Sequence, residues 1–294
     1  MINGIDIYHG DTVSQQDFVD MARANSLYFI FIKATTGGSG KDSKFVEYWQ
    51  MARKAGLMCG AYHFFWPVTD ANAQANNFVI QYKQVSRAGV LPPVVDIEWT
   101  KTNPQQVELW NQVTTTQRIL IIKDYLQKIE LLLNVKPIIY TAHSFWKEFI
   151  TPFSSADDKT FFAQYKLWIA DPNGNGNIPV PWANTIPLIT QNHFGDNVPS
   201  TAPLFQRLDN NIFNGNLKDF LNSALPGFTL MKGFPFSMIV KDIQQKLFDA
   251  GHLADSPDGF YGSKTEGAVK TFQIANAMFA NGIVDAQVWN KLLL

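Results

Sequence analysis

The sequence predicts an α/β fold, a modified TIM-like (β/α) barrel with an irregular last third, followed by a small all-α bundle of three helices. Three observations support this prediction. Eight short apolar runs recur through the first two-thirds of the chain, amphipathic stretches separate the early ones, and the composition changes near Pro226. A doubly wound open sheet is the alternative arrangement of the same elements.

The apolar runs are predicted to be the strands of a parallel sheet. Most are continuous rather than alternating, as expected where helices cover both faces of a strand. A barrel places its working residues at the carboxyl ends of its strands, so the choice of fold also locates the site. The expected strands cover residues 4–8, 27–34, 58–65, 92–98, 136–141, 166–170, 186–191 and 205–209.

Helices are expected over residues 43–55, 71–87 and 113–133. In the first of them, Phe45, Trp49 and Ala52 share one face at helical spacing, and the other two repeat the pattern. Later in the chain, stretches rich in Gly, Asn and Pro replace the helices, namely residues 171–181 and 195–203. The last third of the barrel is therefore expected to be irregular.

A second unit is predicted after the barrel. Residues 222–236 are rich in Gly, Pro and Phe and are expected to be a short linker between a domain of residues 1–221 and one of residues 237–294. The last domain begins with Ile239, Ile243 and Leu247 on one helical face, and two further helical stretches follow.

Composition excludes several classes of function. The net charge of −1 over 294 residues argues against a nucleic-acid binder, which needs clustered Lys and Arg. The single cysteine, Cys59, excludes an internal disulfide and a cysteine-based metal site, and we expect no metal or other cofactor. No stretch approaches the roughly 20 apolar residues that span a bilayer, so no membrane insertion is expected. We expect a monomer.

A pair of carboxylates follows the fourth apolar run. On a strand, Asp96 and Glu98 would face the same side with their Cα atoms about 6.6 Å apart. Two acids this close repel when both are ionised, so one pKa should rise. An acid that keeps its proton beside a charged carboxylate is the pairing that glycosidic bond cleavage needs. A solvated loop edge that happens to carry two acids is the other interpretation.

Further candidate site residues lie at predicted strand ends. Asp6 and Asp209 would converge with the carboxylate pair if the barrel closes, and several buried acids at one point indicate function. Lys33 could contact a substrate or pair with a cleft acid. The candidates for substrate contact from the other strands are Trp66, Tyr140, Trp168 and Gln191. Core packing explains the aromatic ones about as well as stacking on sugar rings does.

Five motifs occur in a fixed order: Gly4-Ile5-Asp6-Ile7, Ile32-Lys33-Ala34-Thr35, Gly60-Ala61-Tyr62-His63-Phe64, Pro92-Pro93-Val94-Val95-Asp96-Ile97-Glu98 and Leu208-Asp209-Asn210. Together they resemble the glycoside hydrolase family 25 muramidases, or Chalaropsis-type lysozymes, over residues 1–221. The resemblance implies a modified (β/α) barrel that hydrolyses the β-1,4 bond between N-acetylmuramic acid and N-acetylglucosamine.

The same resemblance implies roles for individual residues. Glu98 matches the proton donor, and Asp96 matches the partner carboxylate, which acts as a nucleophile or steadies an N-acetyl group that attacks the sugar carbon. Asp6 and Asp209 match the other cleft acids, and Tyr62 matches a cleft tyrosine. The family usually continues the second motif with Glu-Gly, whereas Thr36-Gly37 stands here, so fine specificity is expected to differ.

The last unit resembles the type 1 peptidoglycan-binding domain, a three-helix bundle. The matching residues are 243–247, 258–262, 265, 268–269, 272–273 and 282–285. Bacterial peptidoglycan is therefore the expected partner, and a wall-binding module would raise the local substrate concentration for the catalytic domain. A catalytically inactive wall-binding protein and a hydrolase of another N-acetylated polymer, such as chitin, are the alternatives.

Cellular location is inferred from the start of the chain. No signal peptide is visible, so synthesis in the cytoplasm and action on the bacterial cell wall are expected. A wall hydrolase with a binding module and no signal peptide suggests a phage or prophage endolysin that is released with the help of a holin. Export by another route is the alternative.

Overall fold

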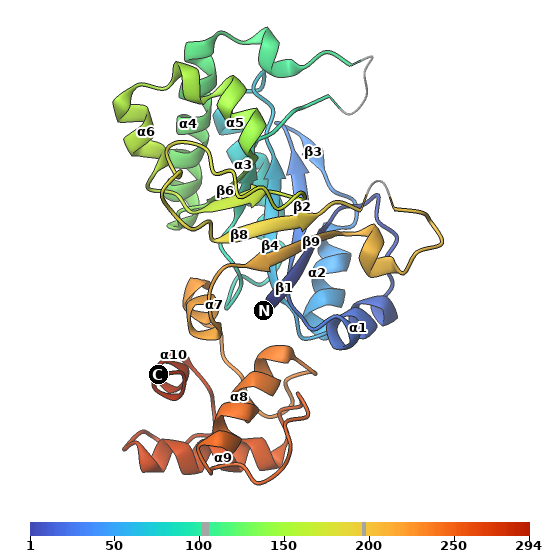
Figure 1. Cartoon of the computed structure of the whole chain (residues 1–294), viewed down its shortest axis with the longest axis vertical. Helices are drawn as coiled ribbons and strands as arrows, with labels where there is room; N and C mark the ends of the chain where they lie inside the picture. Colours follow the sequence, from blue (N-terminus) through green and yellow to red (C-terminus); the bar gives the residue numbers. More distant parts are fainter. Residues whose placement is uncertain (102–105, 196–197) are drawn as a thin grey trace.

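The computed structural model describes residues 1–101, 106–195 and 198–294. Across this part of the chain a single sheet has the strand order β1-β9-β8-β7-β6-β5-β4-β2-β3, and β1 also pairs with β2 (Figure 1). The sheet therefore closes into an eight-stranded barrel, which confirms the predicted barrel over the open sheet. The short β3 (Gly40–Lys41) extends β2 as a hairpin outside this closure. The barrel strands are β1 (Ile2–Ile7), β2 (Leu27–Thr36), β4 (Met58–Phe64), β5 (Val94–Asp96), β6 (Ile138–Ala142), β7 (Leu167–Ala170), β8 (Ile189–His193) and β9 (Asp209–Phe213).

The last strand differs from the prediction. A strand was expected over residues 205–209, but the short 3-10 helix η3 (Leu204–Arg207) stands there and β9 begins at Asp209. The apolar side chains of Leu204 and Leu208 pack with the core between sheet and helices instead of joining the sheet. β9 runs antiparallel to both β1 and β8. Its first inward positions, Asp209 and Asn211, are polar, so a search for apolar runs misses it.

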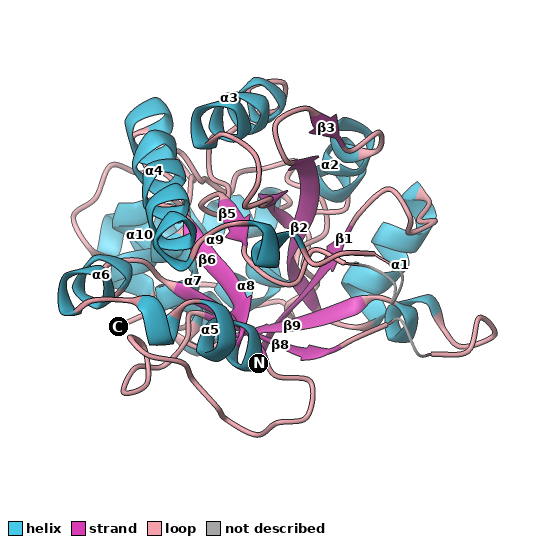
Figure 2. Ribbon diagram, turned by 90° about the horizontal axis from the view of Figure 1, so that it is seen from above, coloured by secondary structure: helices cyan, strands magenta, loops and turns pink. Residues whose placement is uncertain are grey.

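Helices surround the sheet on the side of the early strands, where Figure 2 shows α2, α3 and α4 outside the barrel. The helix expected over 71–87 ends earlier, at Tyr82. Residues 171–181 contain turns but no helix, as predicted, whereas residues 196–197 of the second expected loop lie outside the described residues. The helices are α1 (Gln15–Ala24), α2 (Phe45–Lys54), α3 (Ala71–Tyr82), η1 (Leu109–Gln112), α4 (Thr115–Leu133), α5 (His143–Phe149), η2 (Thr151–Phe153), α6 (Ala156–Phe162) and α7 (Leu217–Ser223).

The predicted helical unit at the end of the chain consists of α8 (Met238–Asp249), α9 (Ser263–Ala275) and α10 (Ala286–Leu292). Two buried glutamines hold the turns between these helices. Gln244 of α8 accepts the backbone N–H groups of Asp258 and Gly259, and Gln273 of α9 accepts that of Gly282. Within the described residues, none of the helices has the length and apolar character that crossing a bilayer requires.

The helical unit packs directly against the base of the barrel (Figure 1). The hydroxyl of Tyr28, at the start of β2, donates a 2.7 Å hydrogen bond to the Asp242 carboxylate of α8. In the connecting segment, Leu225 donates its N–H to the Val90 carbonyl at 2.7 Å, and Leu230 is fully buried. The contacts lie at the amino ends of β2 and β5, the end of the barrel opposite to the carboxyl ends. The connection is therefore a packed joint.

A glycine exchange at this joint should separate close packing from backbone strain. Gly56 has φ +79°, and a Cβ atom there would lie 1.9 Å from the Phe236 carbonyl oxygen, whereas Gly233 has φ +89° and open space around it. Gly233→Ala should lower the free energy of unfolding by about 1 kcal/mol through backbone strain alone. Gly56→Ala should lower it by roughly a further 1–3 kcal/mol, because the joint must shift. Thermal unfolding of both variants measures the difference, and equal losses would contradict the close contact.

Candidate active site

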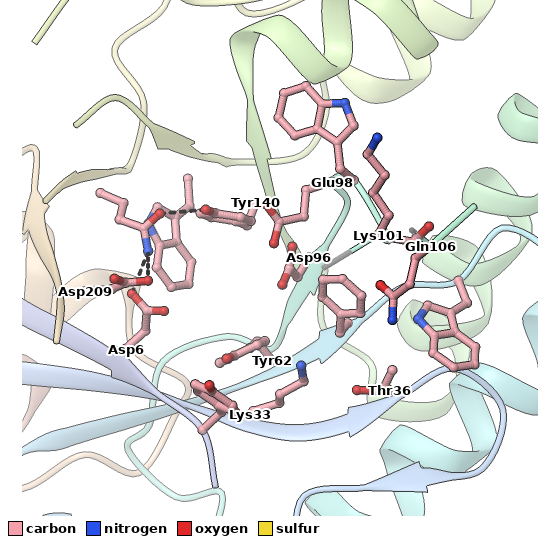
Figure 3. Close-up of a pocket in the computed structure, with 17 residues that line it drawn as sticks. Asp6, Lys33, Thr36, Tyr62, Asp96, Glu98, Lys101, Gln106, Tyr140 and Asp209 are labelled. Atoms are coloured by element: carbon pink, nitrogen blue, oxygen red, sulfur yellow. Dashed lines mark hydrogen bonds between the residues drawn. The ribbon is translucent and has the colours of Figure 1, made fainter. Parts of the chain in front are cut away.

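A cleft of about 630 Å³ opens at the carboxyl ends of the parallel strands. Figure 3 shows acids from β1, β5 and β9 facing one another across it. All ten of the site residues predicted from the sequence line this cleft, together with seven that were not predicted. The full lining is Asp6, Tyr8, Lys33, Thr36, Tyr62, Phe64, Trp66, Asp96, Glu98, Trp99, Thr100, Lys101, Gln106, Tyr140, Trp168, Gln191 and Asp209.

Asp96 ends β5, and Glu98 follows two residues later, past the end of the strand. Asp96 is only 8% exposed, and its Oδ1 atom is buried without a hydrogen-bond partner among the described residues. Burial raises the pKa of Asp96 well above its usual value, the charge of Glu98 raises it further, and Lys33 opposes the rise. Burial is the larger of the two causes that raise the pKa of Asp96, and repulsion by Glu98 is the smaller.

The backbone around Glu98 is held by two residues that sequence analysis missed. The indole N–H of the fully buried Trp110 donates to the Glu98 carbonyl at 2.8 Å. The buried Glu108 carboxylate accepts the N–H of Thr100 at 2.9 Å and its hydroxyl at 2.6 Å. These bonds fix the segment that carries Glu98. The spacing of Glu108 and Trp110 in the sequence is too common a pattern to have predicted this supporting role.

One amide side chain, that of Gln191, bridges the other pair of acids, Asp6 and Asp209. Asp6 and Asp209 are register partners on antiparallel β1 and β9, so Asp209 lies at the start of its strand and not at a carboxyl end as predicted. Gln191 donates from Nε2 to Asp6 at 2.9 Å and to Asp209 at 3.2 Å. Asn211, which was not predicted, donates to Asp6 at 2.7 Å. The sequence offers one indication of this role, because Asn211 lies two residues after Asp209 and would face the same side of a strand.

The pKa of Asp6 predicts how stability depends on pH. Burial raises that pKa well above its usual value, and the charge of Asp209 adds to the rise. The folded protein therefore holds a proton that the unfolded chain loses, so stability should fall as pH rises from about 4 towards neutrality. Asp6→Asn removes this loss and should raise the free energy of unfolding at pH 7 by on the order of 1–3 kcal/mol.

Thermal unfolding at pH 4 and pH 7 measures this effect. The exposed Asp124 of α4 provides the matched control, because Asp124→Asn changes the same chemical group away from the cleft. An Asp6→Asn protein that is less stable than the control at pH 7 would contradict the argument.

The aromatic candidates lie at two depths in the cleft, Trp168 and Tyr140 buried at its floor and Trp66 partly exposed at its rim. Trp168 is almost fully buried, packs on Phe31 with ring centroids 4.7 Å apart, and donates its indole N–H to Asn211. Tyr140 is buried and donates its hydroxyl to Gln191 at 2.6 Å. Trp66 is 38% exposed at the rim. Core packing thus accounts for the two floor residues, and Trp66 offers an open ring face for stacking.

A buried polar network holds Trp66 in place. Gln74 accepts the Trp66 backbone N–H and donates to its carbonyl, both at 2.9 Å. Gln74 also bonds to the Nε2 atom of His63, whose Nδ1 atom bonds to Thr35. Burial lowers the pKa of His63 to about 3, so the ring stays neutral and structural.

Comparisons with known proteins agree with this arrangement. Residues 5–186 match the family model described as glycosyl hydrolases family 25, and residues 239–292 match one described as a putative peptidoglycan binding domain. The muramidase from Acremonium alcalophilum superimposes with a TM-score of 0.62 at 26% sequence identity, covering 76% of this chain and 98% of that one.

Two curated relatives align with the first part of the chain. The uncharacterized protein YegX of Escherichia coli K12 is 31% identical over 173 residues, which cover 58% of this chain and 56% of that protein. Lysozyme M1 of Streptomyces globisporus is 33% identical over 147 residues, 49% of this chain and 48% of that one. The chain thus spans about half the length of these curated relatives.

Proposed function

Because the chain belongs to glycosyl hydrolases family 25, we propose that it is an endo-acting muramidase of bacterial peptidoglycan. It would cleave the β-1,4 bond between N-acetylmuramic acid and N-acetylglucosamine. The observation that carries the proposal is Asp96, a buried carboxylate with an unpartnered oxygen beside Glu98 in an open cleft. An acid left unpaired in this way lowers stability, which is typical of a catalytic site.

In this proposal Glu98 is the general acid, because it is more exposed to the cleft than Asp96. The raised pKa of Asp96 keeps one proton in the pair near neutral pH, and in the reactive form Glu98 carries that proton while Asp96 carries the negative charge. Glu98 donates a proton to the glycosidic oxygen as its bond to the sugar carbon breaks. Asp96 then bonds to that carbon, or steadies an N-acetyl oxygen that does. Water completes hydrolysis and returns a proton to Glu98.

The remaining cleft residues would bind the sugar and stabilise charge. Burial and the nearby acids raise the pKa of Tyr62 well above its usual value, so its hydroxyl stays protonated and can donate to a sugar oxygen. Asp209, and Asp6 in its ionised form, would add negative potential near the positive charge that develops on the sugar ring. Trp66 would stack on a sugar at the rim.

We propose that residues 1–221 form the catalytic domain, residues 222–236 the connection and residues 237–294 a wall-binding domain. The match of residues 239–292 to a putative peptidoglycan binding domain supports the last of these. Release through a phage or prophage lysis system is the route we propose to the wall. A holin gene beside the coding gene would support that route, and a leader cleaved from the native protein would contradict it.

Digestion of purified peptidoglycan, followed by mass spectrometry of the released fragments, tests the function. New reducing-end N-acetylmuramic acid is the expected product. Reducing-end N-acetylglucosamine would assign a different glycosidase, and chitin fragments from a parallel digestion would assign a broader substrate. Binding to the wall without any released fragment would show a wall-binding protein that lacks turnover.

A further inference from the structure

Lys33 is the basic residue of the cleft that lies among aromatic rings. It comes from β2 and is partly exposed. Its Nζ atom lies 4.5 Å from the centroid of the Phe64 ring, 5.8 Å from that of Tyr8 and 6.0 Å from that of Tyr62. Figure 3 shows the side chain directed into the cleft beside Tyr62. Ring faces attract an ammonium group and hold it in position.

Lys33 does not form an ion pair within the described residues. Every ion pair with a nitrogen to oxygen distance of 4.0 Å or less in this part of the chain involves other residues, although four carboxylates line the same cleft. Asp6, for example, is bound by the amides of Gln191 and Asn211 instead. Within the described residues Lys33 thus makes no contact ion pair with a cleft acid, although its charge acts on Asp96 over a longer distance.

An ammonium group without an anion, in a cleft with apolar walls, attracts negatively charged ligands. The proposed substrate is an anion. N-acetylmuramic acid carries a lactyl carboxyl group, which is either free or amide-linked to a peptide with carboxylates of its own. The cleft acids that are ionised repel such a substrate, and a cation beside them offsets this repulsion.

We propose that Lys33 forms an anion subsite that binds a carboxylate of the substrate, and that it makes the cleft selective for muramyl glycans over neutral N-acetylated ones. The inference rests on the proposed function, since it takes peptidoglycan as the substrate. Two carboxylates share this chemistry, that of a peptide-free lactyl group and that of the attached peptide.

A second effect of Lys33 must be separated from this role. Its charge opposes the rise in the pKa of Asp96. Removing that charge should therefore slow hydrolysis of charged and neutral substrates alike and shift the pH profile. A ratio of rates on paired substrates cancels this shared effect and reports only the contact with the carboxylate.

The test is the kcat/KM of wild type and Lys33→Gln on matched glycan tetrasaccharides of alternating N-acetylglucosamine and N-acetylmuramic acid. One pair compares the free lactyl acid with its methyl ester. The other compares an attached L-Ala-D-Glu dipeptide with its neutral amidated form. In at least one of the two pairs, the kcat/KM of wild type should be roughly tenfold higher for the acid than for its neutral form, as expected for a charge-assisted contact. The pair that shows this preference identifies which carboxylate Lys33 binds. The preference should disappear in Lys33→Gln and return in part in Lys33→Arg.

Lys101→Gln is the matched control, because Lys101 is an exposed lysine that lines the same cleft. The acid preference should survive in this variant. The subsite is overturned if wild type and Lys33→Gln show the same ratio on both pairs, or if Lys101→Gln abolishes the ratio instead. Failure of the wild type to cleave any of the four glycans would overturn the proposed function itself, which is a distinguishable result.

Discussion

Glu98→Gln should lower kcat on peptidoglycan by roughly 10²–10⁴-fold, the usual contribution of a positioned general acid. The amide has nearly the same shape as the carboxyl group but has no acidic proton to give to the glycosidic oxygen. The Trp110 bond to the Glu98 carbonyl uses the backbone, so the local fold should persist. Release of reducing ends from purified walls measures the rate, and thermal unfolding verifies the fold.

The exposed Glu148 of α5 offers a matched control, since Glu148→Gln makes the same chemical change outside the cleft. It should digest walls at the wild-type rate. A folded Glu98→Gln protein that does so as well would remove Glu98 from the mechanism and direct attention to Asp96 as the acid.

Asp96→Asn should have the second large effect, a loss in kcat on the order of 10³-fold with KM changed by only a few fold. Asn cannot supply the negative charge that the sugar carbon needs once the leaving group has gone. The variant should also unfold at a higher temperature at pH 7, because a buried carboxylate with an unpartnered oxygen is replaced by a neutral group.

This combination of a slower and more stable protein distinguishes a catalytic acid from a structural one. Steady-state kinetics and thermal unfolding of the same preparation provide both values, with the exposed Asp20→Asn of α1 as the control. A drop in stability with unchanged kcat would mean that Asp96 supports the fold and does not take part in the reaction.

Much of the barrel was predictable because its early strands are apolar on both faces. The pattern around β2 and β4 has no polar interruption until Lys33 and His63, which lie near the strand ends. β9 was placed wrongly because its inward side chains, such as Asn211, serve the cleft and not the core. The short helices α5 and α6 have too few turns to show a clear period.

The candidate site was predictable only in part. The ordered motifs predict that Asp6, Asp96, Glu98 and Asp209 converge, and these four acids do line one cleft. The residues that hold these acids in place do so through contacts between distant segments, such as that of Asn211 with Asp6, and no local sequence pattern encodes such contacts. Burial depth is likewise a tertiary property, so the sequence predicted a raised pKa in this pair but not that burial would be its main cause at Asp96.

The packed joint between barrel and helical unit sets how an anchored enzyme could work. The helical unit adjoins the amino end of β2 through Tyr28, whereas the cleft opens at the carboxyl ends. If the unit holds one glycan strand, the cleft faces away from that strand. The enzyme would then cleave a neighbouring glycan strand. The distance between the bound strand and the cleaved one would be set by the height of the barrel and not by the length of a flexible tether. Such an enzyme would loosen the wall by cutting the glycan strands beside the one that it grips, rather than by travelling along that strand.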